Sequence, residues 1–405
     1  MPKLYAFFGP KLAGTFSATA AFEYSSNPGD TPVSLSLPFD GAAPAWLATP
    51  PGSATANSAY AYLDGLLPDR PEVRERWARS RNLPNTDPIT LLGAYGEDVA
   101  GALTLTTQPD LPQRQPEPLI EATEDDIAAR IAALNREPTS WLDPRAHPRM
   151  SLAGAQGKFT LAKIGDRWFW PTFEQPSTHI LKPPAKEHKN LDLFEHLSLQ
   201  LAQTVGVPAS RSEVLEFCGQ STIVVERWDR HKGIRLHAED LNQALGNFTD
   251  RKYDVEVAGA PQIARLLNKY GQADAFVKQL AFNVALGNGD AHAKNYSVLL
   301  AGGHPVLAPL YDAVPTFFWP RYQGPFSMPI GVAHHPNDLT RANWNFFATQ
   351  AGLAADQVWE QASTVIQGVI NNFEPLFAAG GVDQNRLTMI NKHTRVLQRA
   401  LGAKP

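Results

Sequence analysis

The sequence has only one cysteine, Cys218, among its 405 residues. One thiol excludes an internal disulfide framework and a thiolate-rich zinc site, and it suits a reducing compartment. We expect Cys218 to be a small buried residue. The sequence also lacks an apolar run near the ~20 residues of a membrane span, and its first residues lack the charged-then-apolar layout of a signal peptide. These absences predict a cytoplasmic protein.

An excess of positive charge is missing as well. The chain has 36 Lys and Arg against 40 Asp and Glu, for a formal net charge of −4. Long contact with a phosphate backbone usually needs a basic surface, so we do not expect this chain to bind nucleic acid directly. The 43% of hydrophobic residues suits a globular protein with two or three cores.

Composition changes near residue 108, where the stretch TQPDLPQRQPEPLIEATEDD gathers prolines and charges that cannot form a core. Thr123 and the three acidic residues after it predict a helix start. We therefore predict an α+β N-terminal domain over 1–107, a Pro-rich linker over 108–122, a strand-rich lobe over 123–230 and a helix-rich lobe over 231–405. Within the first domain, LYAFFG and LAGTFSATAAFEY around a Gly-Pro turn predict a hairpin.

The stretch GNGDAHAKNYSVLL crowds polar groups between an apolar helix ending at Leu286 and a predicted strand. Asp290 and Asn295 stand five positions apart. Phosphoryl transfer needs a carboxylate that receives the proton of the attacking hydroxyl and a carboxamide oxygen that holds a divalent ion, so this spacing indicates that chemistry. Asp312, after the next apolar segment, is a candidate second ligand of Mg²⁺. Taken singly, the D-x-x-x-x-N pattern is also compatible with a polar turn, and Asp312 with a capping residue.

Four upstream features suit a nucleotide site, and the first three also have an ordinary alternative. SLAGAQGKFTLAKI is rich in small residues, so its backbone N–H groups could approach phosphates, although a flexible turn gives the same pattern. Lys182 ends an apolar stretch and could bind phosphates, or be a solvated strand end. Glu195 could pair with that lysine, or be a surface residue. The connector in STIVVERWDR could bond an adenine edge through backbone groups of Glu226 and Trp228.

The order of these parts is that of a protein kinase, and the chain closely resembles the HipA kinases, the toxins of bacterial HipBA toxin–antitoxin modules. The resemblance spans nearly the whole chain. It is carried by SLSLPFD, YLDGLLPDRPEVRERW, GEDVAGALTL, SLAGAQGKFTLAKI, STHILKPP, VVERWDR, LHAEDLNQALG, GNGDAHAKNYSVLL and PLYDAVPT.

This resemblance implies an α+β, bilobal protein-kinase-like fold of the phosphoinositide-kinase branch with a small N-terminal domain, and a Ser/Thr protein kinase that uses ATP and Mg²⁺. It implies Asp290 as the catalytic residue, Asn295 and Asp312 as metal ligands, Glu195 as the partner of the phosphate-binding lysine, and Ser151 as an autophosphorylation site that silences the kinase. The implied ATP contacts are Ala153, Gly154, Ala155, Gln156, Gly157, Lys158, Lys182, Glu226, Arg227, Trp228, His292, Ala293, Lys294, Asn295, Tyr311 and Asp312.

The resemblance also implies two partners. One is a HipB-like helix-turn-helix antitoxin, through which any DNA binding would occur, and the other is a protein substrate of the aminoacyl-tRNA synthetase class, with glutamyl-tRNA synthetase as the implied example. Two departures stand out, because the family pattern has Glu where this chain has Gly157 and commonly Phe where it has Trp228. Two alternatives remain open: a small-molecule kinase with the same cleft, and a catalytically weak corepressor subunit of a HipB-like repressor.

Two further features carry no function at this point. The pair His334 and His335 has no third ligand at a suitable spacing, so we expect a solvent-exposed loop there. The aromatic stretch TFFWPRYQGPF is more typical of a loop fixed to a core than of a peptide-binding patch.

Overall fold

The computed structural model describes residues 3–17, 21–27, 30–39, 54–111, 116–141, 151–185, 187–300, 302, 304–320 and 324–402. Four residues of the predicted linker, 112–115, lie outside this set. The chain divides into two compact units. Unit 1 comprises Met1–Asp192, Ser212–Asp250 and Val298–His304, and unit 2 comprises Leu193–Arg211, Arg251–Ser297 and Pro305–Pro405.

Unit 1 opens with a four-stranded antiparallel sheet in the order β3-β2-β1-β4. The predicted hairpin is confirmed, because β1 and β2 pair around a turn in which Gly9 takes a φ of +54°. Prolines 68 and 71 separate the first two helices, since a proline ring is tolerated at a helix start but not in its interior. The elements here are β1 (Lys3–Phe8), β2 (Lys11–Ser17), β3 (Phe22–Tyr24), α1 (Ala54–Gly65), α2 (Pro71–Ser80), α3 (Pro88–Tyr95) and β4 (Leu103–Thr106).

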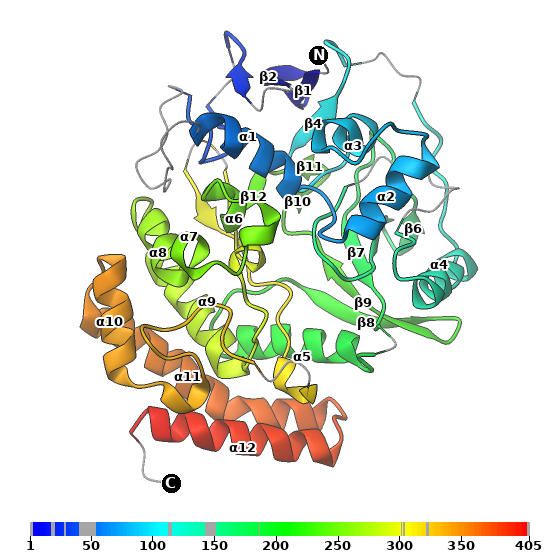
Figure 1. Cartoon of the computed structure of the whole chain (residues 1–405). Coiled ribbons are helices and arrows are strands. Elements are labelled where there is room, and N and C mark those ends of the chain that lie inside the picture. The colour runs from blue at the N-terminus through cyan, green and yellow to red at the C-terminus, as the bar shows by residue number, and fades with distance from the viewer. Residues whose placement is uncertain are drawn as a thin grey trace. The chain divides into compact units, whose positions relative to one another are not determined.

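A second sheet of unit 1 has five strands in the order β6-β5-β7-β9-β8 (Figure 1). The helix predicted after Thr123 is confirmed as α4, where Thr123 and Asp126 form a capping box. Side chains from both sheets and from α1 share one hydrophobic core, which includes Leu4 of β1, Leu161 of β5 and Tyr62 of α1. The elements are α4 (Glu124–Arg136), β5 (Phe159–Ile164), β6 (Arg167–Phe169), β7 (His179–Lys182), β8 (Ser212–Phe217), β9 (Gln220–Glu226), β10 (Arg230–His231), β11 (Ile234–Arg235), β12 (Ala238–Asp240) and α6 (Leu241–Ala244).

Unit 2 is mainly helical. The long helix α11 packs against α9, α10 and α12, and Figure 1 shows α11 and α12 side by side near the C-terminus. The helices are α5 (Leu191–Thr204), α7 (Val255–Ala258), α8 (Ala260–Asn268), α9 (Ala273–Leu286), α10 (Arg341–Ala351), α11 (Ala355–Ala379) and α12 (Gln384–Ala400). Two short strands follow the loop after α9: β13 (Ser297–Leu299), most of which belongs to unit 1, and β14 (Val306–Leu307) of unit 2. Among the described residues, no helix is both long enough and apolar enough to cross a membrane.

Candidate active site

The loop that contains the D-x-x-x-x-N pattern begins where α9 ends, at the predicted Leu286. Gly287 ends the helix in the left-handed conformation, with a φ of +74°, and its N–H donates to the Val284 carbonyl. A Cβ at this position would lie 2.6 Å from Cδ1 of Phe317. Only glycine fits here, because it satisfies both the backbone conformation and the close packing.

Hydrogen bonds inside this loop join the two residues of the pattern. The Asp290 carbonyl accepts from the His292 N–H at 2.8 Å and from Nδ2 of Asn295 at 2.9 Å. Asn295 is 6% exposed and lies in the 3₁₀ turn Ala293–Asn295. Since its amide nitrogen is used as a donor, the amide oxygen, the atom that a hard cation prefers, is held in a fixed orientation.

The Asp290 side chain is exposed, and one oxygen, Oδ1, accepts a hydrogen bond from the Tyr253 hydroxyl. The Tyr253 ring meets the His292 ring edge-on, with centroids 4.9 Å apart. Sequence reasoning missed Tyr253, because it lies 37 residues upstream in a segment without a recognisable pattern.

The candidate metal ligand Asp312 has a φ of +56°, which is uncommon for a residue with a side chain. Such strain is often found at functional sites. Leu310, two residues earlier, is held between Pro208 and Ser210 by two backbone hydrogen bonds of 2.8 Å. The Tyr311 hydroxyl donates to the Lys294 carbonyl at 2.8 Å and lies 2.6 Å from the Ser297 hydroxyl. These bonds position Asp312 without using its carboxylate.

Four other residues of unit 2 that were predicted to belong to the site are buried. His292, Ala293 and Lys294 are each at most 6% exposed. Glu195 is 2% exposed on α5, so the surface alternative for this residue is wrong. The amide oxygen of Asn295 and the carboxylate of Asp312 are each oxygen donors of the kind that Mg²⁺ prefers. The residues present thus fit that ion.

In unit 1 the predicted nucleotide loop is docked against the N-terminal domain. Ser151 is fully buried, its hydroxyl donates to the Leu66 carbonyl at 2.6 Å, and its N–H donates to the Asp98 carbonyl at 3.2 Å. Gly154, with a φ of +103°, accepts a hydrogen bond from the Asp69 N–H at 3.0 Å and donates to the Asp69 carboxylate. The neighbouring Ala153 and Ala155 have only methyl side chains, which leave the backbone of this loop accessible to a phosphate group.

The end of this loop leads into the five-stranded sheet. Lys158 donates through Nζ to the Ala153 carbonyl at 2.9 Å and lies over the Trp141 ring. It directly precedes β5, whose register sets Phe159 opposite Leu181, so Lys158 and Lys182 flank the same end of this strand pair. Both lysines are less than 9% exposed. Two buried cations at the same end of a strand pair suit a polyanion such as a nucleotide phosphate chain.

Gly157 marks the departure from the family pattern. A Cβ there would lie 3.3 Å from both Cδ2 of Leu134 and the Pro138 carbonyl, and 3.9 Å from Nε1 of Trp141. The space that a longer side chain would need is therefore filled by α4 and the segment after it. The preceding residue, Gln156, donates to the Pro183 carbonyl at 3.1 Å, which ties the loop to the end of β7.

The predicted adenine connector follows β9. Glu226 is exposed and Trp228 is half-buried, but the side chain of Arg227 is only 4% exposed. Arg227 donates to both carboxylate oxygens of Asp229, at 2.9 and 2.8 Å, and to the Ser177 hydroxyl at 2.9 Å. The Arg227 side chain thus has a structural role. A contact between the nucleotide and the connector stays a prediction, and it would have to involve the backbone at Arg227.

Arg227 belongs to a buried ionic cluster in unit 1, which we define as Asp98, Arg227, Asp229 and Arg230. Arg230 bridges the two acids, at 2.6 Å from Asp98 and 2.8 Å from Asp229. Burial alone would raise the pKa of both carboxyl groups, but the arginines lower the pKa of Asp98 and of Asp229 well below the usual range. Both acids therefore stay charged throughout the physiological range of pH.

Two other expectations can be compared with the structure. Cys218 is exposed, with its Sγ 3.3 Å from the Asp125 carboxylate, so the expectation of a buried thiol is wrong. The reason is local, because Cys218 forms the tight turn between β8 and β9 and has a φ of +46°. In the aromatic stretch, Phe318 is 6% exposed and packs on Phe194 and Phe377, as expected for a loop fixed to a core. Residues 321–323 of this stretch lie outside the described residues.

Comparison with known proteins decides the family. The model of the HipA-like C-terminal domain matches residues 150–374, and that of the HipA N-terminal domain matches residues 6–106. The chain belongs to the HipA family. It is 32% identical to the putative kinase Y4mE of Sinorhizobium fredii over 75% of this chain and 76% of that protein. It is 25% identical to the serine/threonine-protein kinase toxin HipA of Shewanella oneidensis over 76% and 72%, respectively.

A solved structure from Shewanella oneidensis has the same fold as this chain. A chain in the complex of HipA, HipB and operator DNA from Shewanella oneidensis MR-1 matches with a TM-score of 0.77 and 22% identity, covering 99% of this chain and 98% of that one. The prediction of an α+β, kinase-like HipA fold is confirmed, and the chain is a kinase of this family.

Proposed function

We propose that this chain is an ATP- and Mg²⁺-dependent serine/threonine protein kinase and the toxin of a HipBA-like module. One observation supports the proposal most strongly. Asp290 has an exposed carboxylate, and its backbone carbonyl accepts the hydrogen bond that orients the Asn295 amide. This loop thus combines a proton acceptor with a fixed oxygen ligand, and phosphoryl transfer needs both.

In the proposed reaction, the oxygen of a serine or threonine hydroxyl bonds to the γ-phosphorus of ATP as the bond from that phosphorus to the ADP oxygen breaks. The carboxylate of Asp290 receives the hydroxyl proton. Asn295 and Asp312 would hold Mg²⁺, which when bound neutralises phosphate charge. Lys158 and Lys182 would bind the phosphates, and the connector from Glu226 to Trp228 would bind the adenine edge.

We further propose that phosphorylation of Ser151 silences the kinase. The hydroxyl of Ser151 has no exposure to solvent and is bonded to the Leu66 carbonyl. A phosphate group adds almost two negative charges and three oxygens, which this buried site cannot hold without displacing the loop. Displacement would also move Gly154 and Lys158, so the phosphorylated chain should lose affinity for ATP.

The proposed partners follow from family membership. A HipB-like antitoxin would form a complex with this chain and bind its operator DNA, and an aminoacyl-tRNA synthetase, such as glutamyl-tRNA synthetase, would be the protein substrate. The predicted domain boundaries and the cytoplasmic location are proposals of the same kind.

A nucleotide-binding experiment with two variants tests the assignment of the site. Lys182→Met should weaken the binding of Mg·ATP, measured by calorimetry, at least tenfold, because it removes a buried cation from the phosphates. Asp290→Asn should leave Mg·ATP binding within a few-fold of the wild type but abolish transfer of labelled phosphate to protein. The assignment would be contradicted if Lys182→Met bound Mg·ATP as tightly as the wild type and Asp290→Asn still transferred phosphate at the wild-type rate.

A further inference from the structure

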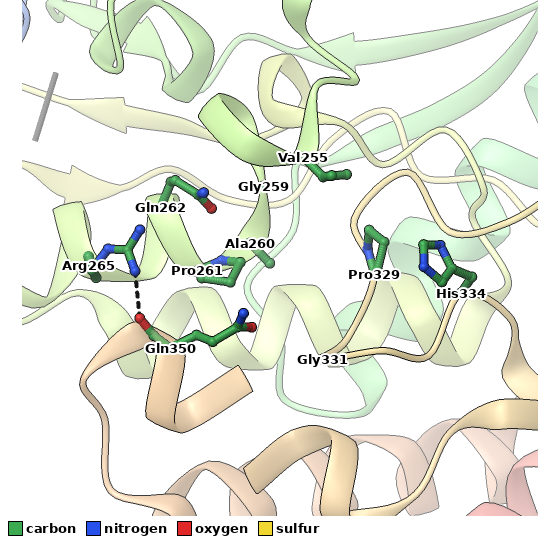
Figure 2. A pocket seen from close by; sticks show the side chains of 10 residues that line it. All are labelled: Val255, Gly259, Ala260, Pro261, Gln262, Arg265, Pro329, Gly331, His334 and Gln350. Atoms are coloured by element: carbon green, nitrogen blue, oxygen red, sulfur yellow. Dashed lines mark hydrogen bonds between the residues drawn. The ribbon is translucent and has the colours of Figure 1, made fainter. Parts of the chain in front are cut away.

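A pocket of about 370 Å³ lies in unit 2, apart from the residues assigned above. Figure 2 shows Gln262, Arg265 and Gln350 on one side of it and Pro329 and His334 on the other. The lining comes from the start of α7, from α8, from the segment before α10 and from the last turn of α10. No residue proposed to bind ATP or the metal lines it.

Two segments that line the pocket are hydrogen-bonded to the loop that contains Asp290. In the first, Tyr253 donates to the Asp290 carboxylate, and the lining residue Val255 follows two residues later. In the second, the Ser327 hydroxyl donates to the Gly289 carbonyl, and the lining residue Pro329 follows two residues later. Two residues span at most about 7 Å. A polypeptide with its hydroxyl at Asp290 therefore needs only a few residues to reach the pocket.

The lining suits a side chain with an apolar stem and a negative end. Val255, Pro261 and Pro329 provide apolar surface, and Arg265 and His334 are the only titratable side chains among the lining residues. Arg265 is exposed, and its Nη1 donates to the Gln350 carbonyl at 2.6 Å. Within the described part of the chain, no carboxylate pairs with Arg265, so its charge is not neutralised there.

A second observation concerns Gln262. Its Nε2 donates to the Glu256 carbonyl at 2.6 Å, whereas its Oε1 is buried and accepts no hydrogen bond within the described residues. A buried acceptor without a donor is unfavourable, and a backbone N–H supplied by a bound polypeptide would satisfy it after a small rotation of the amide. The acids nearby do not compete for Arg265, because Asp254 pairs with Arg251 at 2.6 Å and Glu256 does not line the pocket.

We infer that this pocket docks a segment of the protein substrate that carries a glutamate or aspartate a few residues from the phosphorylated hydroxyl. The carboxylate pairs with Arg265 and the stem of the side chain packs on the prolines. This inference rests on the proposed kinase function and extends it to substrate selection.

The test uses the full-length chain with Mg·ATP and synthetic serine peptides that carry Glu, Gln or Lys at each of the five positions on either side of the serine. The wild type should phosphorylate the Glu peptide about fivefold faster than the Lys peptide at one position, as expected for a partly exposed ion pair. Arg265→Glu should invert this ratio, and Arg265→Gln should bring it close to one. Ratios are used because they do not depend on how much of each preparation is folded.

Lys278→Glu is the matched control, because it makes the same type of charge change at an exposed position of α9 that does not line the pocket. Its ratio should equal that of the wild type. Equal rates for Glu and Lys peptides, or a preference that both Arg265 variants retain, would overturn the inference. Failure to phosphorylate any peptide would also overturn it, and phosphorylation of Ser151 in the same samples would show whether the kinase function itself still stands.

Discussion

Replacement of Asp98 by asparagine tests whether the buried ionic cluster holds unit 1 together. Asp98 is 7% exposed, pairs with Arg230 at 2.6 Å and accepts a hydrogen bond from the Ser177 hydroxyl at 2.6 Å. Asparagine keeps the shape but removes the charge, so Arg227 and Arg230 would share the single carboxylate of Asp229. Removing one partner from a buried ionic cluster costs about 3–5 kcal/mol, because a charge is left uncompensated away from water.

Scanning calorimetry of the full chain measures this cost. At about 2–4 °C per kcal/mol for a unit of this size, the transition of unit 1 should fall by roughly 6–20 °C. Asp356→Asn is the matched control, because its partner Arg341 lies at a similar 2.8 Å but the Asp356 side chain is 92% exposed. This control should cost less than about 1 kcal/mol. Equal shifts in the two variants would refute the reasoning.

The same cluster predicts a dependence on pH. The folded-state pKa values of Asp98 and Asp229 lie below their unfolded values, so the unfolded chain binds more protons as the pH falls. The stability that these acids provide is complete above an unfolded pKa of about 3.9 and is lost as the pH falls through the folded values. The difference in stability between the wild type and Asp98→Asn should therefore narrow below about pH 4. A difference that stays constant down to pH 2 would argue against the ionic origin.

Three further predictions concern the site. Ser151→Asp should weaken the binding of Mg·ATP at least tenfold by calorimetry and expose the loop to limited proteolysis, whereas Ser151→Ala should bind ATP nearly normally. Gly157→Glu should lower both the unfolding temperature and the affinity for ATP, because Leu134 occupies the space; an unchanged affinity would contradict this. Tyr253→Phe removes the hydrogen bond that orients the Asp290 carboxylate, so the rate of phosphate transfer should fall while Mg·ATP binding stays within a few-fold of the wild type. An unchanged rate would exclude a role of Tyr253 in positioning Asp290.

Features set by neighbouring residues could be predicted from the sequence. The start of α4 at Thr123 depends on a cap and an acidic first turn, and the end of α9 at Leu286 depends on the glycine that follows. The position of the loop with Asp290 and Asn295 could also be predicted from nearby residues, because the sequence changes from a helical pattern to polar residues and then to a strand pattern within a short stretch.

Features that depend on distant residues could not be predicted in this way. Arg230 and Asp98 are 132 residues apart, and no local pattern indicates that Arg227 is buried in their cluster. The burial of Glu195 and the exposure of Cys218 depend on how a helix packs and on where a hairpin turns. A single sequence gives the type of these residues but not their surroundings.

Mass spectrometry of the purified chain after incubation with Mg·ATP tests the central claim most directly. Our account predicts phosphate on Ser151 in the wild type and none in Asp290→Asn, with both proteins folded and able to bind ATP. Phosphate on Ser151 in Asp290→Asn at the wild-type rate would contradict the role of Asp290. Absence of phosphate from the wild type, despite measurable ATP binding, would contradict the proposed self-silencing kinase.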